Sequence, residues 1–321
     1  MIVARTTNGS KFGPSDSWML LATVLWGFNF VLVKVSLREL SPAGFNGLRI
    51  LLTALVFLVL LAVSGKGFGV AKRDLWKLIL IGFFGNAVYQ VLFIKAMSLT
   101  TASNTSLILS MSPIYVALLG ALFRIERIHW AAWLGIGVSF LGLYFVIAQQ
   151  HGGPSFSPKS ASGDLAIFFG TMLWALYTVF SDSFLKKMTP LQFATVTMGF
   201  GALFYVPFTA RDILRIPWAS ISWAAWTCLA LSAVFGLVIG YIAWYNSVRK
   251  VGNAKTAIYS SLTPLFTFLF AALWLGEHLH ALLLAGAAVI LAGVYLTRSG
   301  YRFFVKEPAP VTAGRDGSGP A

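Results

Sequence analysis

Polar and aromatic residues recur at helical spacing inside long apolar segments of this sequence. Trp26 and Asn29 lie three positions apart, and Tyr89 and Gln90 follow Asn86 by three and four positions. Side chains with this spacing share one face of a helix. An unpaired amide in hydrocarbon is costly, so we expect these faces to point inward. Eight such residues are predicted to line one central cavity: Trp26, Asn29, Tyr89, Gln90, Trp174, Tyr177, Tyr241 and Trp244.

This lining is suited to a small amphiphilic solute, because aromatic rings with polar tips hold a part-apolar molecule in one orientation. Asn29 and Gln90 would take the polar groups of an amino acid or a similar metabolite, and Arg49 or Lys95 would supply charge for a carboxylate. The alternative is structural. The polar residues could bond neighbouring helices, Arg49 could cap carbonyl groups, and Lys95, like Lys34, could extend to the membrane interface.

Other chemistry has little support in the sequence. Eight of the ten acidic residues fall in loops, tails or helix starts, and none is expected at mid-membrane, which favours facilitated diffusion or exchange over proton coupling. Glu126 and Glu277 are expected to cap the helix that follows each of them. The four histidines fall in loops or at helix ends. We therefore expect no catalytic residue, no metal site and no cofactor, and the single cysteine, Cys228, excludes an intrachain disulfide.

The composition requires lipid as the solvent for most of the chain. Of its 321 residues, 58% are hydrophobic and 11% are charged, and the mean hydropathy is +0.79. A soluble domain is about 45–50% apolar and about 25% charged. Ten continuous apolar runs are long enough for membrane helices and lack the alternation of barrel strands. They cover 17–37, 43–64, 74–97, 101–123, 129–148, 163–185, 190–210, 219–247, 253–275 and 279–297.

The basic residues predict the orientation of these helices. With the N-terminus inside the cell, most of the 24 Lys and Arg residues fall in cytoplasmic segments. Ten helices then place both termini in the cytoplasm. This distribution explains the net charge of +14 without a nucleic-acid partner.

The two halves of the chain resemble each other. Trp26 and Pro42 recur as Trp174 and Pro190, at an offset of 148 residues. At an offset of 151, Pro113, Glu126 and Gly142 recur as Pro264, Glu277 and Gly293. Each half has five helices, so the second half must enter the membrane upside down. The polar residues are less symmetric, since Asn29, Arg49 and Lys95 correspond to Tyr177, Thr197 and Asn246.

This repeat defines the predicted organisation, an all-α integral membrane protein of two inverted five-helix repeats. A cytoplasmic segment (1–16) precedes the first repeat (17–148), a linker (149–162) joins it to the second (163–298), and a tail that we expect to be disordered (299–321) follows. Pro113 and Pro264 fall near the middle of the fourth and ninth helices. Each removes a backbone hydrogen bond, so symmetric kinks are predicted there as hinges or static bends.

Several short motifs carry a family resemblance. They are the run Trp26-Gly27-Phe28-Asn29-Phe30, Arg49, Lys95-Ala96, the stretch from Ala102 to Thr105, Pro113 with Glu126, and Pro264 with Gly276-Glu277. Because these motifs occur in this order and are duplicated between the halves, the chain resembles the drug/metabolite transporter superfamily, specifically its ten-helix EamA-type members. The resemblance covers about residues 17–298 and implies a transporter with helices 1, 3, 4, 6, 8 and 9 around a central cavity.

The expectation is thus a secondary transporter of a small solute in a bacterial inner membrane, working by alternating access as a monomer or homodimer. Export is implied by the resemblance alone. The sequence leaves open a lipid flippase or another membrane scaffold. A flippase should have an apolar opening toward the bilayer, whereas a solute carrier should have a closed polar basket.

Overall fold

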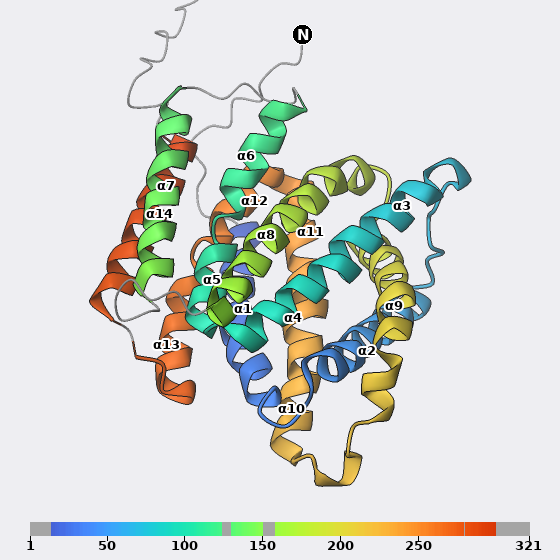
Figure 1. Cartoon of the computed structure of the whole chain (residues 1–321). Helices are drawn as coiled ribbons and strands as arrows, with labels where there is room; N and C mark the ends of the chain where they lie inside the picture. The colour runs from blue at the N-terminus through green and yellow to red at the C-terminus, as the bar shows by residue number, and fades with distance from the viewer. Residues whose placement is uncertain (1–13, 124–129, 150–157, 279, 300–321) are drawn as a thin grey trace, which may run out of the picture.

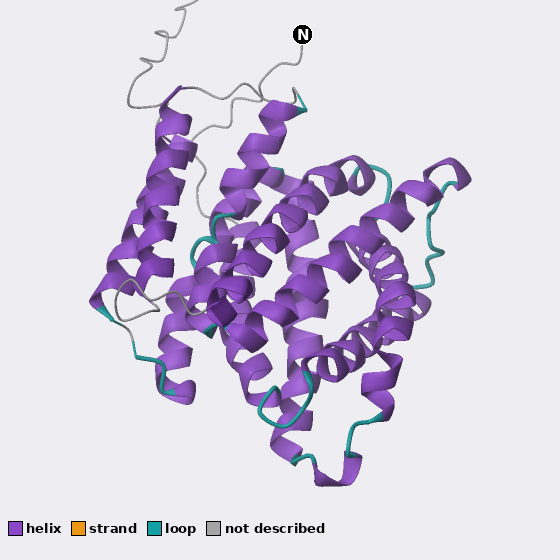
Figure 2. Ribbon diagram, in the orientation of Figure 1, coloured by secondary structure: helices purple, strands orange, loops and turns teal. Residues whose placement is uncertain are grey.

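The computed structural model describes residues 14–123, 130–149, 158–278 and 280–299, and every regular element within these ranges is a helix (Figure 2). The first half contains α1 (Pro14–Ser36), α2 (Pro42–Val63), η1 (Lys72–Asp74), α3 (Leu75–Gly82), η2 (Phe83–Val88), α4 (Tyr89–Leu99), α5 (Ala102–Leu109), α6 (Ser112–Leu122) and α7 (Trp130–Gln149). The second half contains α8 (Pro158–Leu185), α9 (Pro190–Leu214), η3 (Trp218–Ser220), α10 (Trp223–Leu231), η4 (Ser232–Ile239), α11 (Gly240–Val251), α12 (Asn253–Ser260), α13 (Thr263–Leu275) and α14 (Ala281–Ser299).

These elements make the predicted ten-helix membrane protein. In the described residues, 7 helices are long and apolar enough to cross a bilayer, and three shorter apolar helices, Trp133–Phe145, Thr263–Leu275 and Ala281–Leu296, supply the rest. The all-α integral membrane fold is therefore confirmed. Several boundaries differ by three to five residues from the expected ones. For example, α8 begins at Pro158 instead of 163, α9 ends at Leu214 instead of 210, and the eighth helix runs from Trp223 to Val251 instead of 219 to 247.

Helices α2 and α9 begin in the same way, which explains one pair of repeated prolines. Ser41 and Thr189 are the N-cap residues, and Pro42 and Pro190 follow them in the first turn. A hydroxyl at the N-cap accepts a hydrogen bond from a free amide, and proline needs no partner for its missing N–H. Thr189 also forms a capping box with Gln192, whose Oε1 accepts the Thr189 N–H at 2.9 Å.

The third and eighth helices each contain a π-helical segment that the sequence analysis did not predict. In the third helix, η2 separates α3 from α4, and in the eighth, η4 separates α10 from α11. The two segments occupy corresponding positions in the repeat. Such segments shift the register of side chains along a helix and are frequent at functional sites.

The predicted kinks at Pro113 and Pro264 are complete helix breaks. α5 ends at Leu109 and α6 begins at Ser112, while α12 ends at Ser260 and α13 begins at Thr263. Each proline therefore occupies the first turn of a new helix, where its missing N–H leaves no bond unmade. The interruptions therefore fall where kinks were predicted, and each divides its helix into two half-helices joined by two residues.

Helices α7 and α14 form a close pair at one side of the molecule (Figure 1). A Cβ placed on Gly142 would lie 2.7 Å from the backbone N of Ile290, and one on Gly293 would lie 2.5 Å from the backbone N of Ser139. Ser139 and Ile290 are themselves separated by 151 residues, as are the glycines. Contacts that repeat with exchanged partners are the mark of a two-fold axis. The two halves are therefore related by pseudo-two-fold symmetry at this interface.

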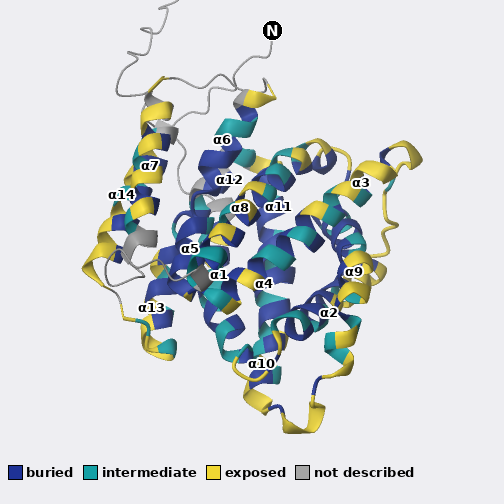
Figure 3. Cartoon of the chain, viewed as in Figure 1, coloured by how far each residue is buried: buried dark blue, intermediate teal, exposed yellow. Residues whose placement is uncertain are grey.

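Many large hydrophobic side chains lie on the exposed surface of the helices, which is yellow in Figure 3. On α2 and α9, the residues Val59, Leu203 and Phe208 are 61%, 63% and 74% exposed. Water-soluble monomers rarely expose contiguous apolar area of this extent. The surface is therefore covered by lipid.

Candidate functional site

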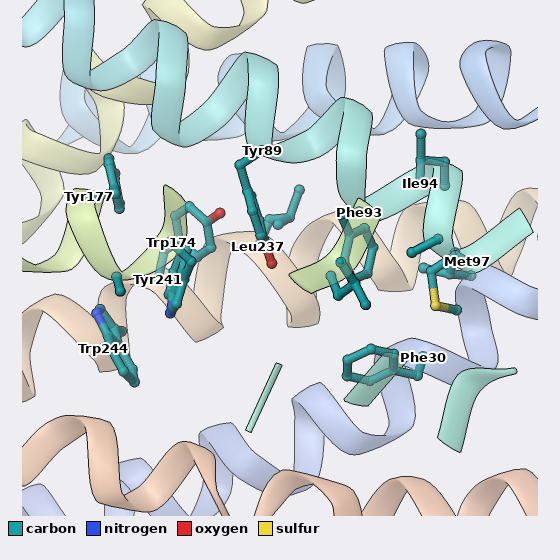
Figure 4. Close-up of a cluster of buried hydrophobic side chains, with 14 of the residues drawn as sticks. Phe30, Tyr89, Phe93, Ile94, Met97, Trp174, Tyr177, Leu237, Tyr241 and Trp244 are labelled. Carbon is teal, nitrogen blue, oxygen red and sulfur yellow. The ribbon is translucent and has the colours of Figure 1, made fainter. Parts of the chain in front are cut away.

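The functional candidates meet where helices from both halves converge. Trp174 of α8 lies at the centre of an aromatic cluster (Figure 4). Its ring centroid is 5.5 Å from those of Tyr89, Tyr241 and Trp244, and 6.3 Å from that of Trp26. Ring pairs at these separations interact favourably when tilted or edge-on. The cluster therefore joins α1, α4, α8 and α11 around one rigid centre.

A narrow cavity lies against this cluster. Its volume is about 60 Å³, which is room for about four to six ordered waters. Most of the lining is aromatic or carries a neutral polar group. Of the ten residues predicted to bind solute, seven line the cavity: Trp26, Asn29, Arg49, Tyr89, Gln90, Trp174 and Tyr241.

Arg49 organises the polar side of the cavity. Its guanidinium donates to Gln90 Oε1 at 2.7 Å and to Ser232 Oγ at 3.2 Å. Ser232 Oγ in turn donates to Asn29 Oδ1 at 2.6 Å. Arg49 is fully buried. It bonds α4 and η4 directly, and it is linked to α1 through Ser232. Phe45 and Phe93 flank the guanidinium, whose carbon lies 5.5 Å and 5.3 Å from their ring centroids.

The charge of Arg49 has no acidic partner among the described residues. The two ion pairs found there join Lys186 to Asp182 and Lys187 to Asp74. The Nε of Arg49 is buried and makes no hydrogen bond. A buried cation surrounded by neutral groups is unfavourable unless an anion is supplied from elsewhere. This arrangement can therefore receive a carboxylate.

Tyr177 belongs to a second polar cluster, behind Trp174. Its hydroxyl bonds the hydroxyl of Thr197 at 2.9 Å and that of Tyr245, and it accepts a bond from Asn86 Nδ2 at 3.4 Å. Tyr177 and Thr197 are the repeat mates of Asn29 and Arg49. The same junction of helices is therefore charged in one half and neutral in the other.

The other two predicted residues lie away from the cavity lining. Trp244 is fully buried against Trp26 and Trp174, and its indole Nε1 has no hydrogen-bond partner. Lys95 is exposed on α4. The structure thus brings Arg49, and not Lys95, to the cavity.

Sequence reasoning missed the small residues of the site. Gly236 and Gly240 lie four positions apart on the eighth helix, and a Cβ on them would meet Asn29 Oδ1 at 2.4 Å and Trp26 Nε1 at 2.2 Å. Trp26 Nε1 donates to the Gly236 carbonyl at 2.9 Å. The spacing of two glycines by four is a recognised sign of close helix packing and could have revealed this contact.

Serines at the helix breaks were also missed. Ser110 and Ser112 beside Pro113, and Ser260 beside Pro264, line the cavity together with Ser106. The hydroxyls of Ser112 and Ser260 lie 3.1 Å apart, joining the two breaks. Because breaks were not predicted, these serines had no expected role.

Glu277 caps a different helix from the expected one. Its carboxylate accepts hydrogen bonds from Ala102 N at 2.9 Å, Ser103 N at 3.1 Å and Ser103 Oγ at 2.6 Å. These groups begin α5 in the other half, so the expectation that Glu277 caps the next helix is wrong. The physical reason is that α13 packs against α5, whose first amides are free. Glu126, its repeat mate, lies outside the described residues.

Replacing Glu277 with glutamine should lower the thermal unfolding midpoint by about 2–4 °C. The loss of a charged cap costs about 1 kcal/mol, and about 1 kcal/mol corresponds to this shift in a large domain. The unfolding of purified protein in detergent, followed by size-exclusion chromatography after heating, measures it. His278→Gln, at the exposed neighbouring position, is the control. Equal midpoints for the two variants would contradict the cap.

A similar carboxylate contact joins the end of α1 to the start of α10. Glu39 accepts hydrogen bonds from Ser222 N at 2.7 Å and Ser222 Oγ at 2.6 Å, and Ser36 Oγ donates to the Ala225 carbonyl at 3.1 Å. The bonds from Ser222 hold the pKa of the Glu39 carboxyl below its ordinary value. The C-terminal end of α1 is thereby fastened to the start of α10.

The part of the chain that the structure describes contains no candidate metal site. No group of three or more His, Cys, Asp and Glu side chains comes together there.

Comparisons with known proteins bear on the fold and the family of the chain. A solved structure described only as "Crystal structure of protein" shares the fold, with a TM-score of 0.66 and 19% identity over 91% of this chain and 99% of its own. The chain is 29% identical to Uncharacterized transporter YyaM of Bacillus subtilis, over 88% of this chain and 92% of that protein.

Two further relatives have names that describe a solute. A "Probable terminal-alkyne amino-acid exporter" of Streptantibioticus cattleyicolor is 27% identical, over 87% of this chain and 92% of that protein. A "Probable amino-acid metabolite efflux pump" of Salmonella typhimurium is also 27% identical, over 88% of this chain and 94% of that protein. Residues 13–148 and 161–299 each match the EamA-like transporter family. Since these two matches cover most of the sequence, the chain belongs to the EamA-like transporter family, and it is a multi-pass membrane transporter.

Proposed function

We propose that this transporter carries a small amphiphilic carboxylate, an amino acid or a similar metabolite, and that it exports it. The observation that supports this most is the buried guanidinium of Arg49, which lines the cavity without an acidic partner among the described residues. A solute carboxylate would neutralise it. A charge-assisted hydrogen bond to such an anion is stronger than one between neutral groups.

The remainder of the cavity suits the rest of such a solute. Asn29 and Gln90 offer amide groups next to Arg49, while Tyr89, Trp174 and Tyr241 offer ring surface. One side of the cavity therefore takes polar groups and the other takes an apolar side chain. Two relatives named as amino-acid or metabolite exporters support the same solute class and direction.

Transport proceeds in this proposal by alternating access, in the inner membrane, with both termini in the cytoplasm and the chain acting as a monomer or homodimer. The breaks before Pro113 and Pro264 serve as hinges, because half-helices joined by two residues can tilt independently. The solute crosses by exchange or by facilitated diffusion in this proposal.

Replacing Asn29 or Tyr241 with alanine should lower transport about tenfold, which corresponds to about 1.4 kcal/mol of lost interaction. Purified protein in liposomes is tested for exchange of labelled amino acids, nucleosides and sugars, and each variant is then compared with the wild type on the best solute. Val59→Ala, on the lipid-facing side of α2, is the control. If both cavity variants exchange solute at the wild-type rate, the proposed site is wrong.

A further inference from the structure

A large apolar groove lies on the lipid-facing side of the molecule between the third and sixth helices. Its volume is about 660 Å³, and its walls carry Leu80 and Phe84 from one side and Leu173, Tyr177 and Phe180 from the other. α4 packs closely along α8, whereas α3 barely contacts it. The two helices therefore diverge toward the start of α3, and the groove widens in that direction.

The corresponding helices of the other half are closed. There α1 packs along α10, and Ser36 and Glu39 bond Ala225 and Ser222. Lys187, the repeat mate of Glu39, instead reaches Asp74 with its long side chain, at 3.1 Å. The groove is thus a further difference between the two halves, and at its mouth the side chains of Lys187 and Asp74 join its two walls.

The inner end of the groove is one aromatic layer away from the central cavity. Tyr177 lines the groove, Trp174 lines the cavity, and their ring centroids are 5.7 Å apart (Figure 4). A Cβ on Gly85 would lie 2.1 Å from Tyr177 Cδ2, so only glycine leaves room for the tyrosine ring at this place. The hydroxyl of Tyr177 is held by Thr197, Tyr245 and Asn86. These three hydrogen bonds hold the Tyr177 ring in place between the groove and the central cavity.

The mouth of the groove carries both signs of charge. Asp74 and Lys187 form an ion pair there, and the Nζ of Lys77 lies 5.6 Å from the centroid of the Trp76 ring. A zwitterion with an apolar side chain matches this arrangement, with its carboxylate at the lysines, its ammonium at Asp74 and its side chain between α3 and α8. A small polar solute would leave the apolar walls unused.

We propose that the groove between α3 and α8 is a second solute site, through which zwitterionic amphiphiles with an apolar tail pass from the lipid leaflet into the central cavity. Tyr177 and Trp174 form the partition that the solute must displace. This proposal rests on the proposed function, since it adds a route to the same cavity. It also explains how a solute carrier can have an apolar opening toward the bilayer without being a lipid flippase.

A labelling experiment tests the route independently of transport. In a Cys228→Ser background, Ser110→Cys places one thiol in the wall of the central cavity. The probe is N-(1-pyrenyl)maleimide, which dissolves in the bilayer of liposomes that contain the protein. Tyr177→Ala should accelerate labelling about tenfold, the change given by a barrier lower by about 1.4 kcal/mol. Adding Leu80→Trp, which fills the groove, should slow it again.

A matched control separates the groove from the membrane surface in general. Leu203→Trp places the same ring on the lipid-facing side of α9 and should leave the accelerated labelling unchanged. If Tyr177→Ala does not fold, Tyr177→Leu provides the same opening with more of the packing kept. The proposal is overturned if neither opening variant accelerates labelling, or if Leu80→Trp and Leu203→Trp have equal effects. A protein that transports no amino acid but shows the expected labelling pattern would refute the proposed function and leave the route intact.

Discussion

Replacing Arg49 with glutamine should lower transport of a carboxylate-bearing solute by about two orders of magnitude. Removing one partner of a buried, hydrogen-bonded charge pair costs about 2–5 kcal/mol. Glutamine keeps a donor for Gln90 or Ser232, so the helices that Arg49 joins stay connected. Exchange of labelled solute in liposomes measures the loss, and thermal unfolding of the same preparation checks the fold.

Two further variants test whether the loss of transport is specific to the guanidinium of Arg49. Arg49→Lys keeps the positive charge without the forked donors, and should retain part of the activity. Lys95→Gln removes a charge at the exposed position on α4 and should transport normally. Equal losses for Arg49→Gln and Lys95→Gln would mean that the overall charge matters and not the site.

Replacing Gly293 with leucine should lower the thermal unfolding midpoint by about 5–10 °C. A Cβ at this position would lie 2.5 Å from Ser139 N and 2.6 Å from Gly135 O. These are backbone atoms, which cannot move aside as a side chain can. Overpacking of this kind costs about 1–3 kcal/mol or more, because α7 and α14 must separate. Heating followed by size-exclusion chromatography gives the midpoint.

Gly137 provides the matched control, because it lies on α7 and a Cβ there would meet nothing within 4 Å. Gly137→Leu should leave the midpoint unchanged or raise it slightly, since leucine favours helix more than glycine does. If Gly137→Leu destabilises as much as Gly293→Leu, the loss reflects bulk in the helix and not the symmetric contact with α14.

The sequence predicts the fold well because the bilayer restricts the possible structures. Only a helix satisfies its own backbone over about 20 apolar residues, so ten runs give ten helices. Pro42 and Pro190 mark equivalent helix starts for the same physical reason in both halves. Interruptions are harder to predict. The break before Pro113 and the π-helical segment η2 depend on tertiary packing that supplies partners for free backbone groups.

Helical periodicity found the side chains that point inward but could not say which of them share one space. Trp26, Asn29 and Tyr89 line the cavity, whereas Tyr177, which was predicted on the same grounds, faces the neighbouring groove. The difference arises because Tyr177 is held by Thr197, where the other half has Arg49. Ser232 was missed because a serine in an apolar helix gives no periodic signal. The partner of Glu277 was missed because the cap crosses from one half to the other.

If Arg49 holds the carboxylate of the transported solute, a competitor without that carboxylate should bind poorly, and a competition experiment measures this. The amino acid that wild-type protein exchanges best in liposomes is labelled, and two unlabelled competitors are compared, the amino acid itself and the amine that lacks only its carboxylate. The unlabelled amino acid should suppress exchange of the label, and the amine, at the same concentration, should not. Equal suppression by the amine, or the absence of amino-acid exchange by the wild-type protein, would contradict this role of Arg49.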